Sequence, residues 1–229
     1  MNEIMNSIFS AWSLIVSLDS EVYGIILLSL LVTVASTGGA AVLGIPIGII
    51  VGSRNFIGKR LFVRVINTLM GLPPVVAGLV VYLFLSCKGP LGHMQLLFTP
   101  AAMVIAQIII VLPIITGLTV VVVQLKYKSI EETCKGLGMS NFRIIIMLIH
   151  ECKYPLFSAL LAGYGRSISE VGAVMLVGGN IQYKTRVMTT SIVLETGKGN
   201  YDKALALGII LILVSFFINW ILQRFQEAK

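Results

Sequence analysis

Long runs without an ionisable residue dominate the pattern of hydrophobic and polar positions along the chain. Such runs cover residues 22–53, 65–87 and 204–223, and residues 89–125 are interrupted only by a histidine. A fifth apolar block, residues 154–177, contains one arginine and one glutamate. About 20 helical residues span a bilayer core, and a backbone in lipid must satisfy its own hydrogen bonds. The pattern therefore predicts an all-α integral membrane protein, a bundle of five transmembrane helices.

The N-terminal segment fits this pattern less well. It is shorter and more polar than a spanning helix, and it lacks the positive start of a signal peptide. We expect residues 1–21 to form an interfacial segment, with a sixth transmembrane helix as the alternative. Residues 22–229 then form a single transmembrane domain.

Small residues recur every four positions in the first run. Gly44, Gly48 and Gly52 follow Ala40 at this spacing, which lets two helix backbones approach closely. The favoured interpretation is packing, within the subunit or across a homodimer. As one helix the run would reach roughly 48 Å, so it must tilt, bend near Gly38–Gly39 or project into the cytoplasm.

Composition supports a membrane protein, because 57% of the residues are hydrophobic and only 12% are charged. Most of the 17 lysines and arginines lie in the connections 54–64 and 126–153 and at the C-terminus. Short basic loops stay on the cytoplasmic side, which predicts an N-terminus outside and a C-terminus in the cytoplasm. Topology thereby explains the net charge of +7, and we expect no nucleic-acid partner.

Enzyme chemistry finds little support in the sequence. The two histidines are His93 and His150, and the string HECKY at 150–154 lacks the second histidine of a zinc protease helix. Neither Gly-Lys pair has the flanking residues of a phosphate loop, and the three cysteines have no paired spacing. We therefore expect no catalytic residue, no metal site and no bound cofactor.

A polar stretch at about 129–152 interrupts the hydrophobic chain and predicts a short helical hairpin in the cytoplasm. Ser129 can cap a first helix with Glu132 as its capping-box partner. Gly138 suits a left-handed helix end, after which Ser140 or Asn141 can cap a second helix.

The string IEETCKGLG at 130–138 resembles the E-A-A-x-x-x-G signature of permease subunits of binding-protein-dependent ABC importers. Glu132 and Gly138 match its glutamate and glycine, whereas Thr133 and Cys134 replace its two alanines. In that family the signature forms a coupling helix that docks into a groove on the ATP-binding subunit. The resemblance implies the following ATPase-coupling residues: Glu131, Glu132, Gly136 and Gly138.

Two longer strings, residues 67–92 and 163–199, are similar to the oxyanion branch of these permeases, and the second is closest to the tungstate-specific members. The resemblance implies a plasma (inner) membrane permease that imports tungstate by alternating access as a homodimer. It also implies two ATP-binding subunits that carry ATP and magnesium, and an extracytoplasmic tungstate-binding protein. Molybdate, sulfate or a general oxyanion remains the alternative cargo. A secondary transporter or channel, or a membrane-embedded enzyme, is the alternative of another class.

Proline and glycine in the middle of the second run predict irregular backbone inside the membrane. Pro73 and Pro74, with Gly71 and Gly78 around them, free backbone carbonyls at that depth. The bend is either packed against neighbouring helices or lines the anion path. Together with Asn67, at the start of the string, the two prolines are pathway candidates.

Arg166 and Glu170 are the charges inside the fifth block. Arg166 lies roughly 18 Å into a helix that begins at Tyr154, and Glu170 is expected one turn later on the same face. Buried ionisable residues in a membrane are functional candidates by default. A mutual ion pair that joins helices is the favoured interpretation, and contact with the anion is the alternative.

The segment 178–203 is expected to be an outer loop. It carries Lys184 and Arg186, with two further lysines, against one glutamate and one aspartate. A positive mouth attracts a dianion by Coulomb forces, and the same loop can dock a binding protein.

Overall fold

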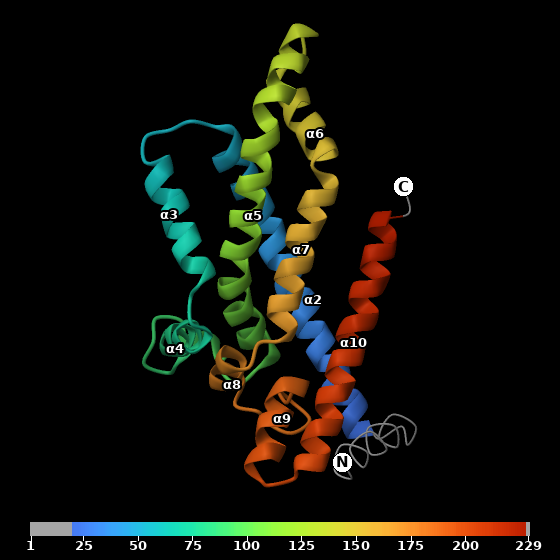
Figure 1. The fold of residues 1–229 in the computed structure, drawn as a ribbon. Coiled ribbons are helices and arrows are strands. Elements are labelled where there is room, and N and C mark those ends of the chain that lie inside the picture. The colour runs from blue at the N-terminus through green and yellow to red at the C-terminus, as the bar shows by residue number, and fades with distance from the viewer. Residues whose placement is uncertain (1–19, 228–229) are drawn as a thin grey trace. The chain divides into compact units, whose positions relative to one another are not determined.

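The computed structural model describes residues 20–227, and no strand occurs among them (Figure 1). The elements are α2 (Ser20–Ser53), α3 (Lys59–Met70), α4 (Pro74–Leu85), the 3₁₀ turn η1 (Gly92–Met94), α5 (Pro100–Gly136), α6 (Asn141–Glu151), α7 (Lys153–Ile168), α8 (Gly172–Gly178), α9 (Met188–Gly197) and α10 (Tyr201–Glu227). The expected interfacial segment lies, up to residue 19, outside the described residues.

Three helices, α2, α5 and α10, are each long and apolar enough to cross a membrane. The pairs α3 with α4 and α6 with α7 are long and apolar enough only when taken together, and they are bent by 101° and 63°. Each pair is either a broken span or a re-entrant loop, and counting each as one span gives up to five spans among the described residues. The chain is thus an all-α integral membrane protein, and the predicted class is confirmed. The first run continues through Gly38–Gly39 as the unbroken helix α2.

Several predicted helix boundaries are wrong, and turn chemistry explains them. The second run is two helices rather than one, because the ring of Pro74 disfavours helical backbone at Pro73 and Pro74 itself begins α4. The run 89–125 becomes helical only at Pro100, since Thr99 caps α5 through its hydroxyl, 3.4 Å from the amide nitrogen of Ala102.

The described residues form two compact units. Unit 1 contains the described residues up to Ser36, together with Pro73–Gln107 and the chain from Ser167 onward. Unit 2 contains Thr37–Leu72 and Ile108–Arg166. Three helices, α2, α5 and α7, belong partly to each unit.

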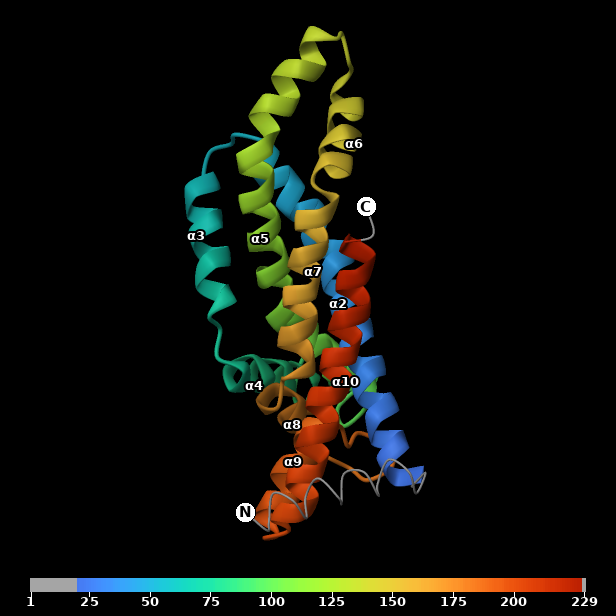
Figure 2. The same cartoon turned by 45° about the vertical axis from the view of Figure 1, so that its right-hand side comes forward.

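Unit 1 packs short helices against the ends of long ones. Helices α9 and α10 run side by side in both ribbon views (Figures 1 and 2). A cluster of buried side chains, including Val22, Met188 and Ile210, joins the start of α2 to them. Helix α8 packs on α4, where a side-chain carbon on Gly78 would lie 2.6 Å from the Cα of Ala173.

A strained loop completes unit 1. Phe98 has a positive φ of 60°, which is unusual for a bulky residue. Its amide donates to the carbonyl of Val177 over 2.9 Å, and its ring packs edge-on against Tyr82. Gly179, with φ of 71°, leaves room for that ring, since an added side-chain carbon would lie 2.7 Å from it.

Unit 2 is built on the small-residue stripe of α2. A side-chain carbon on Gly48 would lie 2.5 Å from Cβ of Thr119 in α5, and one on Gly52 would lie 2.6 Å from Cβ of Val123. Ala40 is buried in the same unit against Val111. The stripe therefore packs within the subunit, which was one of its two predicted roles.

Candidate functional site

The hairpin formed by the end of α5 and by α6 stands out in both ribbon views (Figures 1 and 2). Helix α5 ends in a Schellman motif, in which the amide of Met139 donates to the carbonyl of Cys134 over 2.9 Å and that of Gly138 to Lys135 over 3.0 Å. Gly138 has φ of 71°, so its predicted left-handed conformation is confirmed. Ser140 then precedes α6 with extended backbone.

The predicted first helix of the hairpin is wrong, however. Ser129 lies inside α5, and its carbonyl accepts a bond from the Thr133 hydroxyl over 2.9 Å. No glycine or proline occurs between Gly117 and Gly136, and extending an existing helix costs less than nucleating a new one. The hairpin is therefore a rigid continuation of a long helix.

The two arms of the hairpin are held together by an apolar cluster in unit 2. Val123 of α5 and Leu148 of α6 are fully buried there, together with Cys152. The Lys126 ammonium adds a bond to the carbonyl of Glu151 over 3.2 Å. The three cysteines are free thiols.

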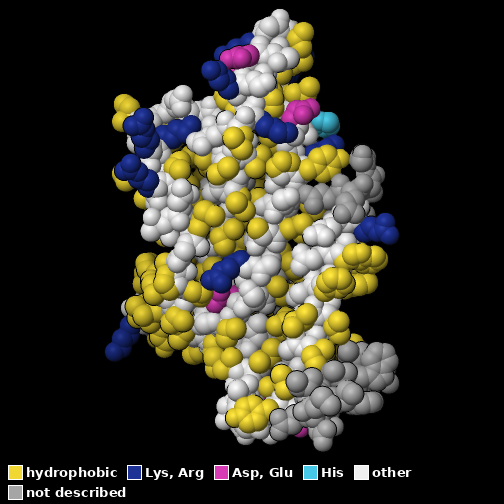
Figure 3. Space-filling model, viewed as in Figure 1, with side chains coloured by type: hydrophobic (Ala, Val, Ile, Leu, Met, Phe, Trp, Pro, Cys, Tyr) yellow, Lys and Arg dark blue, Asp and Glu magenta, His cyan; other side chains and the backbone are white. Residues whose placement is uncertain are grey.

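The outer face of the hairpin carries both charge and apolar surface. Glu132 is exposed, and Glu131 pairs with Lys135 over 2.8 Å. Leu137 and Phe142 are 70% and 75% exposed. Figure 3 shows basic side chains gathered over the end of unit 2 that carries α5, α6 and the start of α3. Exposed apolar residues rimmed by charge are typical of a protein-docking surface.

The predicted pathway residues are divided between the two units. Asn67 is exposed on α3 in unit 2, whereas Pro73 is exposed and Pro74 half-buried in unit 1. Between α3 and α4 the amides of Gly71 and Leu72 donate to Thr68 and Leu69 over 3.1 and 3.0 Å, respectively. The predicted irregular backbone thus takes the form of a complete break between two helices.

The predicted helical register of Arg166 and Glu170 is wrong, whereas their mutual ion pair stays a prediction. Arg166 is half-buried near the end of α7, but that helix stops at Ile168, so Glu170 is not one helical turn later on the same face. Glu170 is 4% exposed, and its Oε1 accepts a bond from the amide of Ala173 in α8 over 3.2 Å. This carboxylate thus stabilises the start of α8. The fifth block becomes two helices, α7 and α8, because the chain leaves helical geometry between them.

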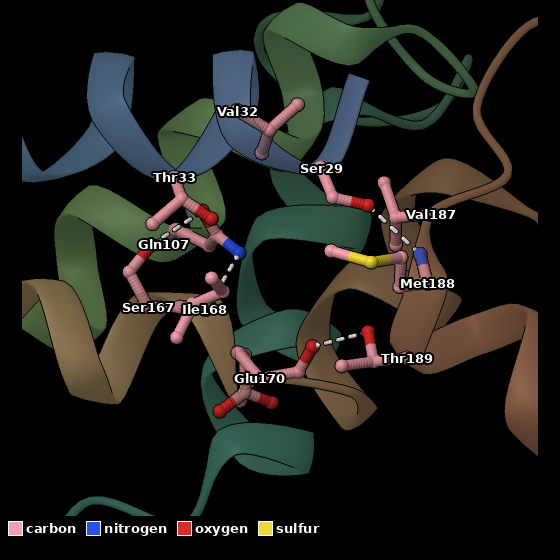
Figure 4. A pocket seen from close by; sticks show the side chains of 10 residues that line it. All are labelled: Ser29, Val32, Thr33, Gln107, Ser167, Ile168, Glu170, Val187, Met188 and Thr189. Carbon is pink, nitrogen blue, oxygen red and sulfur yellow. Dashed lines mark hydrogen bonds between the residues drawn. The ribbon is translucent and has the colours of Figure 1, made fainter. Parts of the chain in front are cut away.

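Glu170 also lines a small buried cavity in unit 1 (Figure 4). The cavity volume of about 10 Å³ is about the room that one water molecule needs. Its polar lining includes the side chains Ser29, Thr33, Gln107, Ser167, Glu170 and Thr189. The Thr189 hydroxyl donates to the carbonyl of Glu170 over 2.9 Å, and the Ser29 hydroxyl accepts from the amide of Met188 over 2.8 Å.

Beside the cavity, three side chains form a closed hydrogen-bonded triad. Oε1 of Gln107 accepts from the hydroxyls of Ser36 and Ser167, each at 2.8 Å. The two hydroxyls also lie 2.8 Å from one another. Nε2 of Gln107 donates to the Ser167 carbonyl over 3.1 Å. Buried polar side chains of this kind hold membrane helices together.

Sequence reasoning missed this triad. Gln107 is the first amide side chain after Pro100, and the next is Gln124. An isolated amide in so apolar a run was the available signal, because a buried amide needs partners. Ser36 and Ser167 gave no comparable signal, since single serines satisfy themselves on their own helix.

The expected outer loop is partly helical, because α9 occupies Met188–Gly197. Lys184 is exposed, but Arg186 lies 3.0 Å from Glu21 at the start of α2. Gln182 also donates to Glu21, over 2.9 Å. Of the two predicted mouth residues, Arg186 thus has its charge balanced by a carboxylate.

A second polar cluster closes the turn between α9 and α10. Glu195 is 5% exposed and accepts bonds from Asn200 over 2.9 Å and from Lys198 over 3.0 Å. The Asn200 amide, followed by Lys198 and the charge of Lys203, keeps the pKa of Glu195 below its usual value. This cluster stabilises the turn rather than presenting free charge.

Comparison with known proteins agrees with these features. Residues 44–228 match the family described as binding-protein-dependent transport system inner membrane component. The chain is 46% identical to the tungstate uptake system permease protein TupB of Peptoclostridium acidaminophilum, over 99% of this chain and 100% of that protein.

Two further relatives extend the match. The chain is 42% identical to a probable anion ABC transporter permease protein of Haloferax volcanii, over 87% of this chain and 88% of that protein. It is 36% identical to the TupB protein of Campylobacter jejuni, over 74% of this chain and 71% of that protein. The resemblance seen in the sequence is confirmed, and the chain belongs to the family of inner membrane components of binding-protein-dependent transport systems, as a multi-pass permease subunit rather than an enzyme.

Proposed function

We propose that this chain is the permease subunit of an ATP-driven importer that carries tungstate into the cytoplasm. The observation that carries the proposal is the similarity to a tungstate uptake permease along almost the whole chain. The hairpin supports the ATP-driven part, because it offers a rigid, outward-facing surface with both charge and exposed apolar side chains. ATP and magnesium belong in this proposal to a separate partner chain.

The assembly that we propose has two copies of this chain, with the anion path at their interface. Two ATP-binding subunits dock on the two hairpins, where Glu131, Glu132, Gly136 and Gly138 are the coupling residues. An extracytoplasmic tungstate-binding protein delivers the anion to the face that carries Lys184 and Arg186. The N-terminus is then outside and the C-terminus is cytoplasmic, as the distribution of basic residues favours, and residues 22–229 act as one transmembrane domain within the lipid.

We propose Asn67, Pro73, Pro74, Arg166 and Glu170 as candidates for the lining of the anion path. The break that starts at Gly71 supports the first three, because irregular backbone at membrane depth requires cover by protein or by a water-filled path. Burial of the Glu170 carboxylate supports the last, since an ionisable group in the membrane is costly unless it has a role.

A second cargo has support of its own. One relative is named only as a probable anion permease, and a sulfate transport system permease protein CysW of Escherichia coli is 25% identical over 90% of this chain. Molybdate, sulfate or a general oxyanion is therefore the alternative. Tungstate, molybdate and sulfate are all tetrahedral dianions, so the anion must be identified by measurement.

The decisive measurement is cellular tungsten and molybdenum content, by mass spectrometry at low external supply. Cells that lack this chain should lose tungsten, and cells given it back should recover it even in excess molybdate. Loss of both metals would replace tungstate by a general oxyanion. No change in either metal would contradict the proposal.

The coupling hairpin can be tested with a matched pair of glycines. Gly138 and Gly58 both have positive φ, of 71° and 92°, and neither has an atom within 4 Å of an added side-chain carbon. Alanine at either position carries a similar backbone penalty of about 1–2 kcal/mol. Gly138→Ala should impair uptake while Gly58→Ala does not, and Glu132→Lys should abolish uptake without loss of the inserted chain. Normal uptake in both hairpin variants would refute the coupling role.

A further inference from the structure

The triad of Ser36, Gln107 and Ser167 occupies a special place along the chain. Ser36 and Gln107 are the last residues of unit 1 before α2 and α5 continue into unit 2, and Ser167 is the first residue of unit 1 after α7 leaves unit 2. The three helices that belong to both units are therefore hydrogen-bonded to one another at the residues where each helix passes from one unit into the other.

The triad is well suited to hold these helices in register. All three residues are buried, with exposures of 0% for Ser36, 4% for Gln107 and 1% for Ser167. The two serine hydroxyls and Oε1 of Gln107 lie 2.8 Å from one another, each on a different helix, and the two hydroxyl protons are shared among these contacts. In a low-dielectric interior an amide that loses such partners is costly, so this point resists separation of the helices.

Glycine or proline also lies close to each point where a helix passes from one unit into the other; these points are called crossings below. On the unit 2 side α2 has Gly38–Gly39, α5 has Pro113 and α7 has Gly163 and Gly165. The fourth crossing, between Leu72 and Pro73, is a complete break of the helix. Glycine and proline are the usual sites of helix bending.

The glycines differ in how much room surrounds them. An added side-chain carbon meets nothing within 4 Å at Gly38 or Gly165, whereas at Gly163 it would lie 2.9 Å from Ile115. The helices next to the triad therefore contain both packed and open glycines. Open glycines bend without displacing a neighbour, because no side chain has to move away.

We propose that the Ser36–Gln107–Ser167 triad is the pivot of transport, a point that keeps α2, α5 and α7 together while the segments beyond it bend. Gln107 is its positioning residue, since its single side chain serves both serines. The hairpin lies on α5 and α6 in unit 2, so force applied there by an ATPase reaches the triad along α5 and α7. This inference rests on the proposed importer function.

The experiment measures transport and ATP hydrolysis together, in proteoliposomes with the ATP-binding subunit and the binding protein. The test variant is Gln107→Leu, which removes the donor and the acceptor at similar volume. The control is Gln124→Leu, because Gln124 lies on the same helix but is exposed. Thermal stability of both purified variants is measured in parallel.

We expect Gln107→Leu to lower the number of anions imported per ATP hydrolysed by about tenfold, as fits the loss of two or three interhelical bonds in a membrane protein. ATP hydrolysis itself should continue, and Gln124→Leu should keep the wild-type ratio. An unchanged ratio in Gln107→Leu would overturn the pivot. An equal loss of import and hydrolysis with lowered stability would also overturn it, because that is the result of a purely structural bond.

A second variant decides the matter if Gln107→Leu does not fold. Ser36→Ala removes one hydroxyl and leaves Gln107 bonded to Ser167. In this variant the number of anions imported per ATP hydrolysed should fall by less than in Gln107→Leu, and an unchanged number would again overturn the proposal. The wild-type protein is measured first with tungstate, molybdate and sulfate. Failure of the wild type to import tungstate contradicts the proposed cargo alone, since the ratio is then measured with the anion that it does import.

Discussion

The two units differ in where their buried polar side chains find hydrogen-bond partners. In unit 2 the buried polar side chains among the described residues are threonines, and Thr116 and Thr119 each donate to the carbonyl four residues earlier on their own helix, over 2.7 Å. In unit 1 the Ser29 hydroxyl also donates within its own helix, to the carbonyl of Ile25, but it accepts a further bond from the amide of Met188, and the Thr189 hydroxyl bonds to the carbonyl of Glu170 in another segment.

This difference teaches how one membrane protein combines rigid and adjustable parts. The stripe of glycines in unit 2 packs backbone against backbone, and close packing tolerates almost no displacement. Hydrogen bonds between segments can exchange partners or admit a water, and unit 1 contains a cavity of that size. The part of unit 2 that is packed through the glycine stripe thus has the character of a stiff lever that carries the hairpin, and the part of unit 1 around the cavity, outside the Ser36–Gln107–Ser167 triad, that of an adjustable polar core.

The largest effect should come from breaking the close packing of unit 2. Gly48→Val places a side chain where Cβ of Thr119 is 2.5 Å and the carbonyl oxygen of Thr116 is 3.0 Å away. We expect a loss of about 3 kcal/mol, the upper part of the range for overpacked cores. The yield of folded protein in detergent measures it.

Gly24→Val on the same helix is the control, because nothing lies within 4 Å of its added carbon. Equal losses in the two variants would show that the stripe is not closely packed.

The contrast in hydrogen bonding can be sharpened with two Thr→Val changes of equal volume. Thr189→Val removes a bond between segments and should cost about 1 kcal/mol. Thr119→Val removes only a bond within its own helix, so the loss in the free energy of unfolding should be smaller than for Thr189→Val. Thermal unfolding of both purified variants gives the comparison, and a larger loss for Thr119→Val would reverse our account of the two units.

A smaller effect should depend on pH. The Asn200 amide and Lys198 keep the folded-state pKa of Glu195 below its ordinary value of 4.5, so the unfolded state binds the proton more readily. The stabilisation is complete above the unfolded pKa and is lost as the pH falls through the lowered one. Melting curves from neutral to acidic pH should show a steeper loss for the wild type than for Glu195→Gln. Parallel curves would mean that this carboxylate does not affect stability.

The smallest effect is expected at the hairpin. Glu131 and Lys135 form an exposed pair one helical turn apart, and such pairs are screened by water. Glu131→Gln should leave the melting temperature unchanged, because the Schellman motif and the apolar cluster hold the hairpin. A clear drop would show that the pair, rather than the backbone motif, fixes the end of α5.

Much of the fold could be predicted from the sequence, because the cost of burying charge in lipid leaves long apolar runs. The class, the conformation of Gly138 and the presence of irregular backbone near Pro73 all followed from local chemistry, although the complete break of the helix did not. The extension of α5 past Ser129 did not, since a capping pattern does not reveal whether a helix already arrives from upstream. Family membership was predictable from the strings around Glu132 and Gly163.

The candidate site was less predictable than the fold. Glu170 was placed on a continuing helix, and no local signal marked the end of α7 at Ile168. Arg186 was counted as free positive charge, but its partner Glu21 is far away in sequence. Partners that distant are brought together only by the fold, and the triad around Gln107 was missed for the same reason.

The break between α3 and α4 also constrains how the protein enters its membrane during synthesis. Each helix has 12 residues, so each reaches roughly 18 Å and is too short to cross roughly 30 Å of hydrocarbon. Neither can be released into lipid as a finished span, so the two must leave the insertion machinery together. The helix ends at this break then need shelter until later helices have been made, which makes the maturation of this protein depend on the order in which its segments emerge.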